Sequence, residues 1–222
     1  MVFPVIGCRE DLERLIEEAG FVPFFKNSIP GFSIEESIDP RLWFADGADG
    51  PWEWKGPVIA RTGCAYGRLL QGKMMYVSRS WYADLVNVRR GGEDFETRYD
   101  MGLISRDEKR IADVLSGVSS MQSKMLRAQV RCEKSSAFDK AITRLQMSGD
   151  VTITGFDYAV DRFGAPYGWG IARYALPEKH FGEAFEDEVY ARTPEQSRTR
   201  IEEHLTALLG GAYKKKIETM IG

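Results

Sequence analysis

Residues 139–155 read DKAITRLQMSGDVTITG, and this stretch changes from helical to strand periodicity at a single glycine. Before Gly149, Ile142 and Leu145 recur at the spacing of one helix face. After it, β-branched residues alternate in VTIT as they do in a strand. Glycine readily adopts the left-handed conformation that closes a helix. The stretch therefore predicts a helix that passes into a strand without an intervening loop.

Further elements are predicted on both sides of this stretch. Upstream, SRDEKRIADVLS (105–116) begins with Ser105 as an N-cap, and SSMQSKMLRAQV (119–130) predicts a second helix. On that second helix, one apolar face is formed by Met121, Met125, Leu126 and Val130. Downstream, the turn RFGAP separates the strand from the return strand YGWGIARYAL (167–176). Three short helices followed by a β-hairpin are typical of a winged helix-turn-helix.

The fold class predicted for the whole chain is α+β. Residues 1–102 are expected to form an N-terminal aromatic-rich α+β domain, and residues 103–180 the winged helix. Residues 181–222 are expected to form a C-terminal helical extension that packs on the winged helix.

Positive charge is concentrated around the predicted third helix. The net charge of the chain is −3, yet residues 121–144 hold six basic and two acidic side chains, an excess of four positive charges. Such a helix and the tip of a wing commonly contact duplex DNA. The candidate nucleic-acid-binding residues are Lys134, Ser135, Ser136, Lys140, Thr143, Arg144 and Arg162. The alternative is a solvated helix face in a domain that binds a protein partner.

Aromatic and basic residues alternate in residues 43–90. Such a mixture can stack on unpaired bases, so we expect a candidate pocket from Trp52, Trp54, Tyr66 and Arg89. In an enzyme acting on a flipped nucleobase, Glu53 or Asp94 would be the catalytic acid or base. The alternative is that the aromatic residues form core and that Glu53 pairs with Lys55 or an arginine. Whether the chain is an enzyme stays open.

Composition limits the remaining classes of function. With two histidines and three dispersed cysteines, the chain offers few zinc ligands, and we expect neither a metal nor another cofactor. No apolar run reaches the roughly 18 residues of a membrane span, and no secretory signal is visible. A cytoplasmic protein with reduced thiols is therefore expected. The sequence leaves the oligomeric state undetermined.

Two sets of segments resemble a known family. The wing and tail, YGWGIARYALPEKH (167–180) and TPEQSRTRIEEHLTALLG (193–210), resemble AlkZ (YcaQ-type) winged-helix DNA glycosylases. The front of the chain resembles a bacterial group described as AlkZ-related, in the segments GFVPFFKNSIPGFS, PWEWKGPVIARTGCAYGRLLQGK and WYADLVNVRRGGEDFETRY.

The resemblance implies a DNA-associated fold and a link to DNA repair, but it carries over no catalytic residue. AlkZ enzymes are longer and use a Gln-x-Gln motif to place the catalytic water. In this sequence no two glutamines have that spacing: they are Gln71, Gln122, Gln129, Gln146 and Gln196. A non-catalytic DNA-binding protein, regulatory or accessory to repair, is therefore expected, with the nucleobase-acting enzyme as the alternative.

Overall fold

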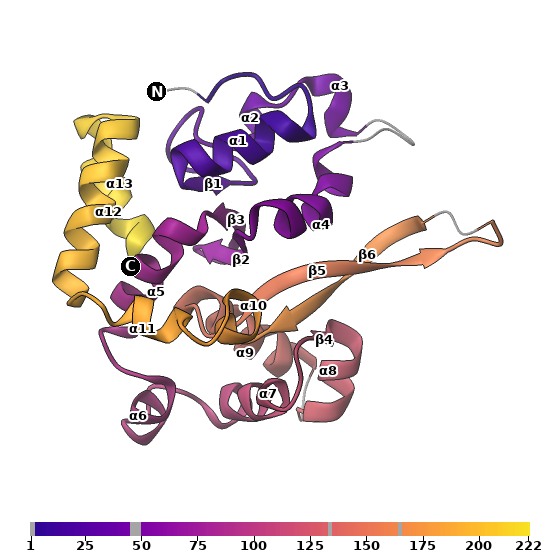
Figure 1. Ribbon diagram of the computed structural model, residues 1–222, viewed down its shortest axis with the longest axis vertical. Coiled ribbons are helices and arrows are strands. Elements are labelled where there is room, and N and C mark those ends of the chain that lie inside the picture. The colour runs from indigo at the N-terminus through magenta and orange to yellow at the C-terminus, as the bar shows by residue number, and fades with distance from the viewer. Residues whose placement is uncertain (1–2, 45–49, 133–134, 164–165) are drawn as a thin grey trace.

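In the computed structural model, which describes residues 3–44, 50–132, 135–163 and 166–222, buried side chains gather in two hydrophobic cores. The first core joins the N-terminal part of the chain to its C-terminal helices. The second core lies among three helices and the hairpin that follows them. The fold is mixed α and β, as predicted (Figure 1).

The first core surrounds a three-stranded antiparallel sheet with the strand order β1-β3-β2. The elements of this part and the short helix that follows them are α1 (Arg9–Ala19), β1 (Phe21–Pro23), α2 (Ile34–Ser37), α3 (Pro40–Trp43), α4 (Pro51–Thr62), β2 (Ala65–Leu70), β3 (Lys73–Val77), α5 (Arg79–Arg90) and α6 (Phe95–Asp100). Many of the aromatic residues in this part are buried, among them Tyr66, Tyr76 and Tyr82. Their burial agrees with the interpretation that these rings form core.

The second core is formed by the elements predicted from the opening stretch and the segments on both sides of it, together with one short strand that was not predicted. They are α7 (Arg106–Ser116), β4 (Met121–Gln122), α8 (Ser123–Val130), α9 (Ser135–Ser148), β5 (Thr152–Val160) and β6 (Pro166–Ala175). The strands form an antiparallel sheet in the order β4-β6-β5. One prediction for α8 is wrong, because Met125 is 60% exposed while Leu126 and Val130 are buried.

Helix α9 ends at the predicted glycine. Gly149 has a φ of +78°, in the left-handed region, and the amide of Asp150 donates to the carbonyl of Leu145 at 2.8 Å. A Cβ at this position would lie only 2.4 Å from a methyl group of Val86 on α5. The glycine therefore serves the turn and also the close approach of α9 to α5.

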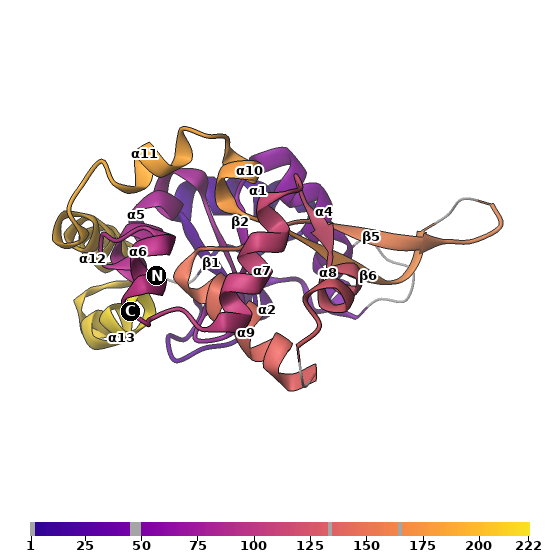
Figure 2. The same ribbon diagram turned by 90° about the horizontal axis from the view of Figure 1, so that it is seen from below.

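The β5–β6 hairpin belongs to both cores. Its base packs on the N-terminal part, where Phe156 lies 6.2 Å from the ring of Tyr66, and Ile153 is buried in the first core. Beyond the base, the hairpin extends past the rest of the molecule (Figures 1 and 2). It is thus held at one end and projects at the other.

The C-terminal segment packs mainly on α5. We expected it to pack on residues 103–180, the predicted winged helix. Its elements are α10 (Pro177–Phe181), α11 (Phe185–Val189), α12 (Pro194–Leu209), a 3-10 turn (Gly211–Tyr213) and α13 (Lys214–Ile221). Asn87 of α5 donates to the hydroxyl of Ser197 at 3.0 Å, and that hydroxyl donates to Asp84 at 2.8 Å. The prediction failed because the spacing of apolar residues reveals the buried face of α12 but not the helix on which that face packs.

A buried cluster of ionised side chains connects the two halves of the molecule. Asp150, which lies two residues after the end of α9, is 2% exposed and lies 3.0 Å from Arg90 and 2.5 Å from Arg98. The hydroxyl of Ser148 donates to the same carboxylate at 2.5 Å. Burial by itself lowers the pKa of Arg90, but neighbouring groups, with Asp150 first, outweigh it and raise that pKa. The carboxylate therefore fixes α9 to α5 and α6.

Candidate nucleic-acid interface

Helix α9 presents the predicted inner and outer faces. Ile142 and Leu145, which form the predicted apolar face, are buried together with Phe138, whereas Lys140 and Arg144 are exposed, so the predicted burial is confirmed. Lys140 forms no ion pair among the described residues, so its charge is available to an outside partner.

The start of α9 is described only in part. The helix begins at Ser135, and Ser136 is exposed. Lys134, another candidate, lies outside the described residues. A phosphate contact at this end of the helix therefore stays a prediction.

A second side of α9 is covered by β2, which the sequence did not reveal. Gln146 is 1% exposed, and its side-chain oxygen accepts a hydrogen bond from the amide of Arg68 at 3.0 Å. The methyl group of Thr143 would lie 3.9 Å from a Cβ placed on Gly72. Because β2 occupies this side, α9 has only a narrow exposed strip with which to approach DNA.

Arg144 is exposed but already has a partner. Its Nε lies 3.1 Å from the carboxylate of Glu108, which is 2% exposed, and its guanidinium donates to the carbonyl of Leu103 at 3.3 Å. Glu108 also accepts from the amide of Ser105 at 2.8 Å, as the capping residue of α7. The arginine thus neutralises a buried charge, which a sequence cannot show.

Arg162 lies at the exposed end of the hairpin, as predicted. Its guanidinium lies over the ring of Phe163 at 4.6 Å, and Phe163 is 79% exposed. The amide of Phe163 donates to Asp161 at 2.8 Å, which fixes the turn locally. The part of the tip that the structure describes therefore offers the cation of Arg162 and the exposed ring of Phe163.

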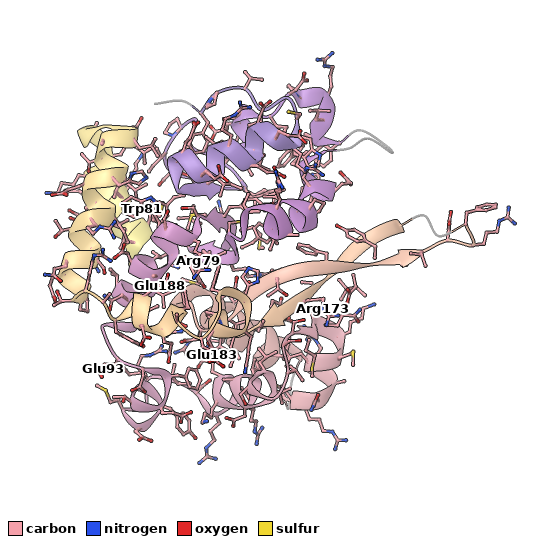
Figure 3. The ribbon with its side chains drawn as sticks, in the orientation of Figure 1. Arg79, Trp81, Glu93, Arg173, Glu183 and Glu188 are labelled. Carbon is pink, nitrogen blue, oxygen red and sulfur yellow. The ribbon has the colours of Figure 1, made fainter. Side chains whose placement is uncertain are left out.

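The base of the hairpin is braced by a polar network on the strands β4, β5 and β6. Arg173 lies at the base of the hairpin (Figure 3). It donates to Asp157 at 2.9 Å and to the hydroxyl of Ser120 at 3.1 Å, and Gln122 donates to Asp157 at 2.8 Å. Burial acts to raise the pKa of Asp157, but the hydrogen bonds from Gln122 and Arg173 outweigh it and lower that pKa. These hydrogen bonds join β4, β5 and β6 at the base of the hairpin and so fix the direction in which the hairpin projects.

A small cationic cavity lies beside the hairpin base, and we call it the α8–α9 cavity. It has a volume of about 220 Å³ and is lined by Arg68, Ser123, Lys124, Arg127, Phe138, Asp139, Ile142, Thr143 and Tyr174. Arg68 and Lys124 are exposed and form no ion pair among the residues that the structure describes. Sequence reasoning did not choose these two cations as binding residues. The charge excess in residues 121–144 was a signal for Lys124, but nothing local pointed to Arg68.

The four residues of the candidate pocket do not form one site. Trp54 is 2% exposed in the first core, and Trp52 and Tyr66 both contact Phe24, with ring centroids 5.1 and 6.5 Å from it. Arg89 lies apart from this aromatic group. Its guanidinium donates to four backbone carbonyls, those of Leu69, Met147, Met220 and Ile221. Burial lowers the pKa of Arg89 to about 10.

The two candidate catalytic carboxylates both cap helices. Glu53 accepts from the amide of Gly50 at 3.2 Å at the start of α4. Asp94 accepts from the amide of Thr97 at 2.8 Å at the start of α6, and this hydrogen bond lowers the pKa of Asp94. A lowered pKa suits a permanent carboxylate more than a general acid.

Lys55 has a role that differs from the expected pairing with Glu53. It is 9% exposed, and its amine lies 5.3 Å from the ring of Trp52 and 4.7 Å from that of Phe156. Burial lowers its pKa, while the charge of Glu53 acts in the opposite direction. Cation–π contacts of this kind attach α4 to the base of the hairpin.

Two general features complete the description. None of the described helices is both long and apolar enough to cross a lipid bilayer. Within residues 3–44, 50–132, 135–163 and 166–222, no three His, Cys, Asp or Glu side chains come together as a metal site.

Comparison with known proteins gives one match. A family model described as AlkZ related matches residues 6–222, which is nearly the whole chain. No curated protein and no solved structure matches the chain.

Proposed function

The chain belongs to the AlkZ-related family, and from this premise we propose that it is a winged-helix protein that binds duplex DNA in an accessory or regulatory role in repair. The proposal includes no base release, since the sequence lacks the Gln-x-Gln spacing of the AlkZ glycosylases. The observation that carries it is the projecting hairpin, braced at its base and carrying a cation at its tip.

The order of elements supports a winged helix. The first helix, α7, is followed by the short strand β4, by α8 and α9, and by the hairpin. Strand β4 pairs with β6, which in turn pairs with β5. In a helix-turn-helix protein the last helix of the unit lies nearest the DNA, and a hairpin beside it can contact the backbone.

The exposed charges favour contacts with phosphates over the reading of base edges. Lys140 on α9 and Arg162 on the hairpin point to solvent and form no ion pair among the described residues. Arg144 is occupied by Glu108, and β2 covers the side of α9 that holds Gln146. A helix held in this way cannot lie deep in the major groove, so we propose binding that is largely independent of sequence.

The alternative, an enzyme that acts on a flipped base through Glu53 or Asp94, is less well supported. Both carboxylates are helix caps, and Trp54 is part of the core. The other candidate ligand of the hairpin is a protein, because Val160 and Phe163 near its tip are exposed and apolar.

We expect Lys140→Ala and Arg162→Ala to weaken binding to all duplex sequences alike. Each removes one phosphate contact, so each should reduce the slope of log affinity against log salt by about one unit. Fluorescence anisotropy with two unrelated duplexes measures both effects. Lys214→Ala, at an exposed position on α13, is the control and should leave binding unchanged. If Lys140→Ala and Arg162→Ala bind like the control, the proposal fails and the surface serves a protein partner.

Arg144→Ala should separate stability from binding. Removing this guanidinium leaves the carboxylate of Glu108 buried without its ion pair, so the melting temperature should fall. DNA affinity at a temperature where the variant is folded should stay at the wild-type value. A loss of affinity limited to certain DNA sequences would show that Arg144 leaves Glu108 to read a base.

A further inference from the structure

The α8–α9 cavity has the charge and shape of an anion site. Among the described residues, Arg68, Lys124 and Arg127 line it against a single carboxylate, Asp139, which gives this part of the lining an excess of two positive charges. Asp139 pairs with Arg127, whose guanidinium also lies 4.5 Å above the ring of Phe138. Arg127 is thereby held in place, while Arg68 and Lys124 have no carboxylate of their own among the described residues.

Neutral donors complete the lining. The hydroxyls of Ser123 and Thr143 and the phenol of Tyr174 lie on three different elements around the cavity. Burial raises the pKa of Tyr174, while Arg68 and Arg127 both act to lower it. Arg68, Arg127 and Tyr174 all line the same small cavity.

The shape of the cavity favours the end of a chain over its middle. Phe138 and Ile142, which are 2% and 4% exposed, close one side of it. A phosphodiester inside a strand must continue on both sides, which a site closed on one side hinders. A phosphomonoester has one substituent, three acceptor oxygens and a charge of about −1.5 to −2 at neutral pH. That charge matches the excess of two positive charges.

We propose that the α8–α9 cavity binds a phosphomonoester, and specifically the terminal phosphate of a DNA strand at a nick or gap. The identity of the ligand as a strand end rests on the DNA binding proposed above. The planar guanidinium of Arg68 forms paired hydrogen bonds to two phosphate oxygens, and Lys124 adds a second, more flexible charge. Arg127, oriented by Asp139, binds the remaining oxygen.

The experiment compares nicked duplexes of one sequence whose nick bears a 5′-phosphate, a 3′-phosphate or only hydroxyl groups, with the intact duplex as reference. Fluorescence anisotropy should show affinity about tenfold higher for one phosphorylated nick than for the hydroxyl nick, which corresponds to about 1.4 kcal/mol. Arg68→Gln and Lys124→Gln should abolish this preference, so that each variant binds the phosphate and hydroxyl nicks with equal affinity. The matched control Lys214→Gln should retain the preference. Arg68 and Lys124 are exposed, so equal melting temperatures will show that these variants are folded.

The other outcomes separate this inference from the proposed function. Equal affinity for phosphate and hydroxyl nicks, with intact duplex still bound, overturns the phosphomonoester site and leaves duplex binding intact. Absence of DNA binding, together with a deoxynucleoside monophosphate that raises the melting temperature of the wild type but not of Arg68→Gln, assigns the cavity to a free nucleotide. That outcome overturns both the strand end and the proposed DNA binding.

Discussion

Replacing Asp150 by asparagine is expected to lower the free energy of unfolding by about 3–5 kcal/mol. The carboxylate is 2% exposed, and it neutralises Arg90 and Arg98, which are themselves 6% and 4% exposed. Taking away one partner of a buried ion pair leaves the remaining charge without compensation in a medium of low polarity. Here two arginines lose their shared partner, and Arg90 keeps only Glu186, which is 50% exposed and lies 3.4 Å away. Urea denaturation, followed by circular dichroism, measures the change.

An exposed ion pair provides the control for this substitution. Asp113 is 58% exposed and lies 2.6 Å from Lys109. Because such pairs contribute only about 0–1 kcal/mol, Asp113→Asn should be nearly neutral. If Asp150→Asn proves as mild as Asp113→Asn, the cluster does not hold α9 to α5 and α6.

Phe138→Ala is expected to destabilise the protein by about 3–5 kcal/mol, the usual cost of removing a buried aromatic ring. The ring is 2% exposed in the second core, and the guanidinium of Arg127 covers it. Its loss opens a cavity under the exposed strip of α9 that contains Lys140.

Phe163→Ala is the matched control for Phe138→Ala, because it removes an exposed aromatic ring where Phe138→Ala removes a buried one. That ring is 79% exposed at the hairpin tip, so its removal should change the free energy of unfolding by no more than about 0.5 kcal/mol. Chemical denaturation of both variants under one set of conditions gives the comparison. Similar values for the two would contradict the assignment of Phe138 to the core.

Local signals in the sequence were sufficient to predict the three helices α7, α8 and α9 but not the short strand β4. Ser105 is readable as an N-cap without a structure, and in the structure its hydroxyl accepts a hydrogen bond from the amide of Glu108. Gly149 marks the end of α9 because its backbone conformation disfavours other residues. Both features depend on residues only a few positions apart.

Contacts between distant segments were not predictable in the same way. The hydrogen bond from Arg68 to Gln146 joins residues 78 positions apart, and it decides that β2 covers one side of α9. The ion pair of Arg144 with Glu108 is likewise a tertiary contact. The periodicity of apolar residues identifies the exposed and buried faces of a helix but not the element that packs on the buried face. For this reason the prediction that the C-terminal helices pack on residues 103–180 was wrong.

The candidate site was predicted in part. Lys140 and Arg162 are exposed cations, as the sequence suggested. Arg68, which lines the α8–α9 cavity, was not among the predicted candidates because it comes from a strand in a different part of the chain. Met125 was assigned to the core because a short amphipathic helix leaves the edge of its apolar face ambiguous.

The salt dependence of duplex DNA binding by the wild-type protein tests the central claim most directly. Each phosphate contact contributes a slope of about −0.9 to a plot of log affinity against log salt concentration. With Lys140 and Arg162 both in contact, we expect a linear plot with a slope of about −2 or steeper, equal for unrelated sequences. Binding that is absent at low salt, or that does not change with salt, would contradict the account and assign the helix and hairpin to a protein partner.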